Sequence, residues 1–273
     1  MRSRLIGPLV AIAALLALPG AAVATTQTSH LGNVAATFTF QGKFPTFSHL
    51  HLTISNAGQV LYDAPVSSRL CPNPCTPGDP FAHGQSARVL DLESNGQPDV
   101  VLGLYTGGAH CCFVDQVYSL DPGTMTYVSK EQYFGDAGAA IKDLHHDGHL
   151  EFVSTNDAFY YAFGSFADSG APIQIWAFSA GRFADITRKF PQLIRRDAAR
   201  WWRLFTHNYS AGEGLIAPWA ADEYLLGHSQ QVKRTLARQL KLGHLHSDLS
   251  PQVPSGRKFV AALQRFLHKQ GYV

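Results

Sequence analysis

Apolar and polar residues alternate along most of residues 25–186, which is the pattern of β-strands with one buried face. One such run, residues 33–40, would place four apolar side chains on the same face: Val34, Ala36, Phe38 and Phe40. Two turn-forming tripeptides, Asp121-Pro122-Gly123 and Ser179-Ala180-Gly181, each separate two such runs. The pattern therefore predicts a series of antiparallel hairpins.

The apolar period changes to that of an amphipathic helix after residue 187. Four helices are expected, beginning at or after Pro191, Pro218, Ser229 and Ser255. Glycines that favour helix ends follow the last three, at positions 227, 243 and 271. The Trp201-Trp202 pair is expected in the helical core, because large aromatic side chains dominate cores.

The first 24 residues have the features of an export signal. Arg2 and Arg4 precede an apolar run, Leu5–Leu18, and Ala22-Val23-Ala24 matches the small-x-small cleavage rule. The mature chain is therefore expected to begin at Thr25. Because the apolar run is shorter than a spanning helix requires, a secreted protein without a membrane span is predicted.

The remaining chain is expected to have an α+β organisation, with a β-rich domain over 25–186 and an α-helical region over 187–273. Residues 25–181 hold five Lys/Arg against fourteen Asp/Glu, and residues 182–273 hold fifteen against six. These opposite charges favour packing of the helical region on the β-rich domain. The alternative is that the basic helices meet an anionic partner.

Two nine-residue strings carry the same oxygen-rich pattern, DLESNGQPD at 91–99 and DLHHDGHLE at 143–151. Each has an acid at loop position 1, a polar residue at 3, Asn or Asp at 5, Gly at 6 and an acid at 9. Ca²⁺ takes six to eight oxygen ligands, and a Gly lets the chain turn sharply enough for alternate side chains to converge. The strings therefore predict calcium loops. The alternative is that both are Asx/Gly turns that hold no metal.

The strings are not EF-hands, because loop position 12 would be Leu102 or Ser154 rather than Glu. They resemble the cation loops of FG-GAP or VCBS-type repeats, known from integrin-α-like β-propellers. This resemblance implies propeller-blade-like antiparallel hairpins with Ca²⁺ bound inside each. The implied first ligand set is Asp91, Glu93, Asn95 and Asp99 with the Gln97 carbonyl. The implied second set is Asp143, His145, Asp147 and Glu151 with the His149 carbonyl.

The chain departs from that family in three respects. Glu93 is longer than the usual Asp or Asn. His145 offers nitrogen where a hard cation prefers oxygen, so the second loop is expected to be weak, vacant or adapted. Two copies are too few for a closed propeller of roughly four to eight blades. The resemblance covers about residues 85–180, an approximate extent set by the loops and their flanking strands.

The strings at 105–112 and 172–176 also resemble those of a type of exported bacterial protein. That resemblance implies export and supplies no activity.

The four cysteines, Cys71, Cys75, Cys111 and Cys112, all lie in the β-rich part. An even count in an exported chain favours two disulfides, with three pairings open. Because adjacent cysteines would close a strained ring, bonds that cross between the two pairs are sterically easier, and the connectivity stays open. A reactive thiol beside His110 is the alternative.

The sequence contains no convincing catalytic constellation. His145, His146 and His149 lack the spacing of a zinc motif. The candidate carboxylates for an exported hydrolase have no spacing that singles out a pair: Asp115, Asp157, Asp168 and Asp185. The prediction is an exported, calcium-binding, non-enzymatic structural or ligand-binding module with an unknown extracytoplasmic ligand, and nucleic acid is not expected as its partner. The alternatives are that hydrolase, or an adhesin whose basic helices bind an anionic polymer.

Overall fold

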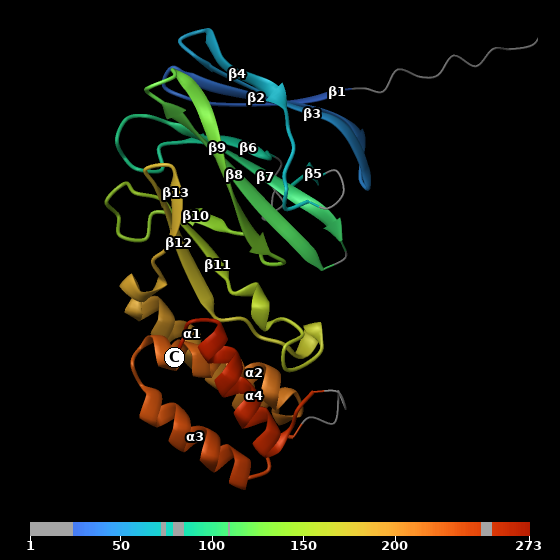
Figure 1. The fold of residues 1–273 in the computed structure, drawn as a ribbon, viewed down its shortest axis with the longest axis vertical. Coiled ribbons are helices and arrows are strands. Elements are labelled where there is room, and N and C mark those ends of the chain that lie inside the picture. Colours follow the sequence, from blue (N-terminus) through green and yellow to red (C-terminus); the bar gives the residue numbers. More distant parts are fainter. Residues whose placement is uncertain (1–23, 72–74, 79–84, 109, 247–252) are drawn as a thin grey trace, which may run out of the picture.

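The computed structural model describes residues 24–71, 75–78, 85–108, 110–246 and 253–273. Three antiparallel sheets follow one another in chain order, and four α-helices lie beyond the third (Figure 1). The architecture is α+β, as predicted. The expected export signal lies outside the described residues except for Ala24.

The first sheet is a four-stranded meander in the order β1 (Ala24–Leu31), β2 (Val34–Lys43), β3 (Thr46–Asn56) and β4 (Gln59–Pro65). The alternation of apolar residues on β2 and β3 buries one face of this sheet. That face packs against the second sheet, with Phe38, Leu52 and Ile54 fully buried.

The second sheet is built on β7 (Asp99–Gly108), β8 (Cys111–Asp121) and β9 (Thr126–Gly135). Two short strands, β5 (Thr76–Pro77) and β6 (Ala87–Leu90), pair with β7. Successive side chains of β7 point to opposite faces, so Val100 and Leu102 face the first sheet while Val101 faces the third. The second sheet is thus packed on both faces, which explains the unbroken apolar run in β7.

The third sheet has the order β10 (Ala140–Lys142), β11 (Glu151–Thr155), β12 (Ile173–Ser179) and β13 (Arg182–Asp185). Two 3₁₀ turns, η1 (Asp157–Phe159) and η2 (Phe166–Asp168), lie between β11 and β12. Phe134, Phe152 and Phe178 belong to the core shared with the second sheet. Both predicted turn tripeptides connect adjacent strands of these two sheets.

The helical region comprises η3 (Thr187–Lys189), α1 (Pro191–His207), η4 (Tyr209–Ala211), α2 (Gly212–Leu225), α3 (Ser229–Lys241) and α4 (Gly256–Lys269). Helix α2 is buried along almost its whole length, and the other helices present one apolar face to the core. Trp201 is in that core, as predicted. Within the described part of the chain, no helix is long and apolar enough to cross a membrane.

One predicted helix start is wrong, because Pro218 lies inside α2 rather than at its beginning. A proline has no N–H for the carbonyl four residues earlier, here that of Gly214. The backbone N–H of Gly170 donates to that carbonyl instead, at 2.9 Å. The Gly214 carbonyl, which receives no hydrogen bond from Pro218, is therefore hydrogen-bonded by a residue outside the helix.

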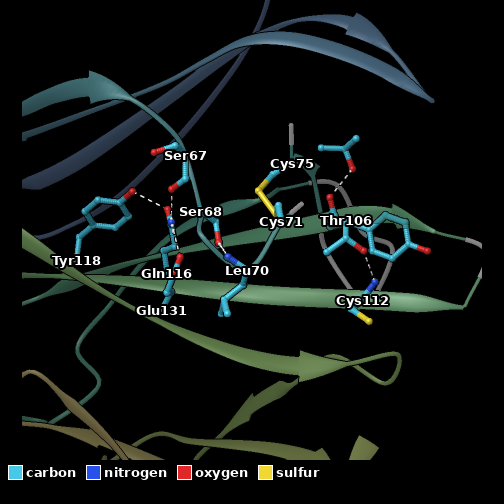
Figure 2. The surroundings of a disulfide bond; sticks show 12 residues. Ser67, Ser68, Leu70, Cys71, Cys75, Thr106, Cys112, Gln116, Tyr118 and Glu131 are labelled. Carbon is cyan, nitrogen blue, oxygen red and sulfur yellow. Dashed lines mark hydrogen bonds between the residues drawn. A yellow bond between two sulfur atoms is a disulfide. The ribbon is translucent and has the colours of Figure 1, made fainter. Parts of the chain in front are cut away.

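The cysteines do not adopt the crossed pairing, which the sequence favoured only on steric grounds. Cys71 is joined to Cys75, with 5.5 Å between their Cα atoms, and Cys111 is joined to Cys112. Figure 2 shows the Cys112 sulfur pointing away from the Cys71–Cys75 bond.

Strand β7 separates the two cysteine pairs. Thr76, next to Cys75, pairs with Tyr105 on one side of β7, and Phe113, next to Cys112, pairs with Tyr105 on the other. Two strand spacings of about 4.8 Å put Cys75 and Cys112 about 10 Å apart, beyond the ~7 Å that a disulfide can span.

Candidate metal loops

The two oxygen-rich strings occupy equivalent places in consecutive sheets. Residues 91–98 connect β6 to β7, and residues 143–150 connect β10 to β11. Each loop joins two directly paired antiparallel strands, and its position 9, Asp99 or Glu151, is the first residue of the second strand. The sequence repeat therefore corresponds to a repeated hairpin.

The two loops have the same backbone conformation. Positions 4 and 6 have positive φ in both, with values of 50° at Ser94 and 79° at Gly96, and 58° at His146 and 88° at Gly148. Left-handed backbone at these positions turns each loop back toward its strand.

The side chain at position 1 organises each loop. The N–H groups of Asn95 and Gly96 donate to the two carboxylate oxygens of Asp91, at 3.0 and 2.9 Å. The equivalent N–H groups of the second loop donate to Asp143 at 3.2 and 3.0 Å. A carboxylate has about four lone-pair sites, so each aspartate keeps acceptor capacity for a cation.

The side chain at position 5 also points into its own loop. Asn95 Oδ1 accepts the N–H of Gln97 at 2.8 Å, and Asp147 Oδ1 accepts the N–H of His149 at 3.0 Å. These contacts repeat from one loop to the other. They are the hydrogen bonds of Asx turns, which the alternative interpretation also predicts.

The two loops contact one another. The N–H of Leu150 donates to the carbonyl of Leu92 at 3.0 Å. A Cβ atom on Gly148 would lie 2.5 Å from Ser94 Oγ, so a larger residue there would push the loops apart. The loops are therefore neighbours at the junction of the second and third sheets.

Glu93, at position 3 of the first loop, is directed toward the third sheet. Its carboxylate accepts the Ser179 hydroxyl at 2.7 Å and the Ala180 N–H at 3.2 Å, both at the β12–β13 turn. The length of glutamate, which departs from the family pattern, gives it this reach. Glu93 thus ties the first loop to a turn 86 residues later.

Asp99, at position 9 of the first loop, is only 5% exposed. Burial raises the pKa of Asp99 to about 6. The hydroxyl of Ser119 and the N–H of Leu92 act to lower that pKa, whereas the charges of Glu93 and Asp91 raise it. Among the described residues, no Lys or Arg forms an ion pair with any of these three acids.

The second loop has a different set of neighbours. The His145 ring packs on Phe190 with centroids 4.5 Å apart, and its Nδ1 lies 3.7 Å from Glu151. Glu151 is buried and accepts the N–H of Leu144 at 3.0 Å. Burial opposes ionisation of Asp143, but backbone N–H groups led by that of Gly148 lower its pKa overall.

The structure therefore brings some predicted ligands together and not others. In each loop the side chains at positions 1 and 5 point into the loop, and the carboxylate at position 9 accepts the N–H of position 2. The side chain at position 3 contacts residues outside the loop, Ser179 and Ala180 for Glu93 and Phe190 for His145. In the part of the chain that the structure describes, no group of three or more His, Cys, Asp or Glu side chains is arranged to hold a metal. The four candidate side chains of the first loop, Asp91, Glu93, Asn95 and Asp99, all carry side-chain oxygens.

The carboxylates considered for a hydrolase are dispersed over different elements. Asp157 accepts the hydroxyl of Tyr133, Asp168 that of Ser165, and Asp185 that of Thr187. Asp115 is buried in β8. Their neighbours identify no acid–base pair among these four.

The sequence did not reveal a buried carboxyl pair between the third sheet and the helices. Asp197 Oδ2 accepts the N–H of Ile173 at 2.8 Å and the indole N–H of Trp201 at 3.0 Å. Burial, followed by the charge of Asp197, raises the pKa of fully buried Asp222 well above its ordinary value. Burial also raises the pKa of Asp197. The two acids lie where α1 meets β12. In the sequence, the four-residue spacing of Asp197 and Trp201, which places both on one face of a helix, is the feature that points to this site.

Two known proteins are similar to part of this chain. A probable thylakoid lumen protein of Synechocystis is 29% identical over 158 residues, covering 55% of this chain and 47% of the relative. An uncharacterised protein of Sinorhizobium fredii is 25% identical over 148 residues, covering 50% of this chain and 22% of the relative. The chain thus spans about half the length of the first relative and about a fifth of the second. No family model and no solved structure matches the chain.

Proposed function

We propose that this chain is an extracytoplasmic, non-enzymatic module in which Ca²⁺ stabilises the junction between two sheets. The first loop, residues 91–99, is the principal site. The second loop is a weaker or vacant copy, because its position 3 is His145. The module would serve a structural or ligand-binding role, in keeping with the resemblance to FG-GAP and VCBS-type loops.

The observation that carries the proposal is the uncompensated negative charge of the first loop. Burial is the main cause of the raised pKa of Asp99, and the nearby charges of Glu93 and Asp91 raise it further. Like charges that are partly withdrawn from water are costly, and a divalent cation removes that cost. The repeated loop conformation and the remaining lone pairs of Asp91 also support a cation here.

The location of the loops gives the cation a structural role. Leu92 of the first loop contacts Leu150 of the second loop, which leads directly into β11 of the third sheet. A cation that fixes the first loop would therefore also fix the third sheet against the second. Disorder of this junction would expose Phe152 and Phe178 of their shared core.

The extracytoplasmic assignment rests on the N-terminal sequence and on one relative. The lumen named for the Synechocystis relative is a space that exported proteins reach. The Cys71–Cys75 bond also fits an oxidising compartment. A fusion of residues 1–24 to a reporter that needs export tests this assignment, because a reporter left in the cytoplasm would contradict it.

Thermal melts of the mature protein in Ca²⁺ and in chelator test the calcium site. A ligand at a hundredfold excess over its dissociation constant stabilises the folded state by about 2.7 kcal/mol. Asp91→Ala should remove most of the Ca²⁺-dependent rise, and Asp63→Ala, an acid on the exposed edge strand β4, should retain it. Identical wild-type melts in the two conditions would rule out the site.

The adhesin alternative gains support from the surface of the helices. The fifteen Lys and Arg residues of 182–273 include twelve exposed ones on α1, α3 and α4. Three of the acids in that region, Glu213, Asp222 and Glu223, are buried. The helical surface is therefore more basic than its composition indicates. Retention on immobilised polyphosphate that falls steeply with salt would support this second function, and retention unchanged by salt would contradict it.

A further inference from the structure

The Cys111–Cys112 pair adjoins a chain of polar groups that the calcium proposal does not use. Tyr133 of β9 places its hydroxyl 2.7 Å from Cys112 Sγ and 3.3 Å from Cys111 Sγ. The same hydroxyl donates to Asp157 Oδ2 at 3.1 Å. Both sulfurs are thus in contact with a phenol that is itself bound to a carboxylate.

A hydrogen bond and a glycine together fix the position of the Asp157 carboxylate. The N–H of Asp136 donates to Asp157 Oδ1 at 2.9 Å. Gly135 lies directly under the Asp157 side chain, and a Cβ atom there would overlap the carboxylate. The absence of a side chain at Gly135 therefore lets Asp157, in the 3₁₀ turn η1, reach Tyr133 on the second sheet.

The two sulfurs differ in their access to solvent. Cys112 is 1% exposed, whereas Cys111 is partly exposed. An external thiolate can therefore reach Cys111 but not Cys112. The Cys71–Cys75 bond has no such asymmetry, because both of its residues are buried.

We propose that Cys111–Cys112 is a thiol–disulfide exchange site that reacts with an external dithiol, with Tyr133 assisting the departure of Cys112. One thiolate of the dithiol attacks Cys111 Sγ, and the electrons of the S–S bond pass to Cys112 Sγ. The second thiolate attacks the sulfur of the dithiol in this mixed disulfide and releases Cys111. The dithiol becomes a disulfide, and the protein gains two electrons and two protons.

The hydroxyl of Tyr133 suits this role because its hydrogen can be redirected. In the oxidised protein the phenol donates to Asp157. When Cys112 leaves as a thiolate, the same hydrogen can turn to the sulfur, because both acceptors lie within reach. A hydrogen bond to the leaving thiolate lowers the basicity of that sulfur and speeds its departure. Burial, followed by the charge of Asp157, raises the pKa of Tyr133 to about 12, so the phenol keeps its proton at neutral pH.

The test measures how fast each disulfide of the folded mature protein is reduced by dithiothreitol. Samples are quenched with iodoacetamide at intervals, and mass spectrometry of the peptides gives the labelled fraction at each cysteine. Cys111 and Cys112 should be labelled at least about tenfold faster than Cys71 and Cys75, because an attacking thiol needs access to the sulfur. Equal rates for the two disulfides, or free thiols at 111 and 112 before any reduction, would overturn the proposal.

Variants then test the phenol. Tyr133→Phe should slow labelling at Cys111 and Cys112 about tenfold, equivalent to ~1.4 kcal/mol, without changing Cys71 and Cys75. Tyr161→Phe is the matched control, because Tyr161 is an exposed tyrosine in the same region. An unchanged rate in folded Tyr133→Phe would overturn the role of the phenol. If that variant fails to fold, the comparison of the two disulfides in the wild type still decides whether the exchange site exists.

The reduced form gives a separate readout. Two neighbouring thiols chelate trivalent arsenic, so the reduced protein should bind one equivalent of phenylarsine oxide. Cys112→Ser should bind none at this position. Failure of the reduced wild type to bind would show that the two thiols do not act together, and would contradict the proposal. Neither measurement depends on Ca²⁺, so this inference can fail while the calcium proposal stands.

Discussion

Replacing Asp99 by Asn should separate the electrostatic cost of the first loop from its packing. The side-chain amide of the variant would retain an oxygen to accept the Ser119 hydroxyl, but it would carry no charge at any pH. Asp99 is 5% exposed, and its pKa rises from the ordinary 3.8 to about 6, chiefly through burial. The folded protein therefore holds a proton on Asp99 between about pH 4 and about pH 6, whereas the unfolded chain does not.

The sign of the effect follows from that difference in bound protons. Stability due to Asp99 is fully present below the unfolded pKa and is lost as pH rises through the folded pKa. At ~1.4 kcal/mol per pKa unit, a rise from 3.8 to about 6 corresponds to a loss of about 3 kcal/mol. Asp99→Asn cannot lose that stability, so in chelator at neutral pH it should be more stable than the wild type by up to about 3 kcal/mol. In saturating Ca²⁺ the order should reverse, because the cation neutralises Asp99 and the amide is a poorer ligand.

Urea unfolding in chelator at about pH 5 and about pH 7.5 measures this effect as a difference between variant and wild type. That difference removes the contributions of other buried acids, including Asp197 and Asp222. Asp63→Asn is the control, because hydrogen bonds led by that from Thr53 lower the pKa of Asp63, so its titration lies below this window. Equal pH dependence in wild type and Asp99→Asn would refute the assignment of a costly buried charge to the first loop.

Three further predictions concern the framework around the loops. Trypsin should cleave slowly at Arg182, Arg188 and Lys189 at both low and high salt. The segment between β13 and α1 is held by buried Thr187 and Phe190, and salt does not screen the burial of apolar groups. Rapid release of a folded helical fragment would show two independent domains. Joint replacement of Cys71 and Cys75 by Ala should cost about 2 kcal/mol in urea unfolding, the loop-closure value for so short a loop, and an unchanged midpoint would contradict it. Asp222→Asn, which mimics the protonated acid, should lose less stability than the wild type as pH rises above the ordinary aspartate pKa of 3.8, because burial and then the charge of Asp197 raise the pKa of Asp222. Parallel stability curves in urea unfolding across that rise in pH would argue against the raised pKa.

The strand pattern, the turn tripeptides and the repeated loops could be predicted because each is a local property of the sequence. Alternation with a period of two reports one buried face, and Gly96 and Gly148 mark the same left-handed turn in both loops. The contacts of Glu93 could not be predicted, since its partners at Ser179 and Ala180 lie in another sheet.

The errors have the same physical origin. A proline is expected at a helix start because, inside a helix, it leaves the carbonyl four residues earlier without a donor. Here Gly170, far away in sequence, donates to that carbonyl of Gly214, so Pro218 is tolerated inside α2. The cysteine pairing depended on β7 lying between Cys75 and Cys112, which is a fact of sheet order. The buried pair of Asp197 and Asp222 likewise required the docking of α1 on α2 and β12.

A crystal structure of the mature protein grown in Ca²⁺ tests the central claim most directly. The account predicts a cation in the first loop with Asp91, Asn95 and Asp99 oxygens at about 2.3–2.6 Å, and with the Glu93 carboxylate turned from Ala180 toward it. Well-ordered density for the first loop at saturating Ca²⁺, with no cation and with Glu93 still bonded to Ala180, would contradict it.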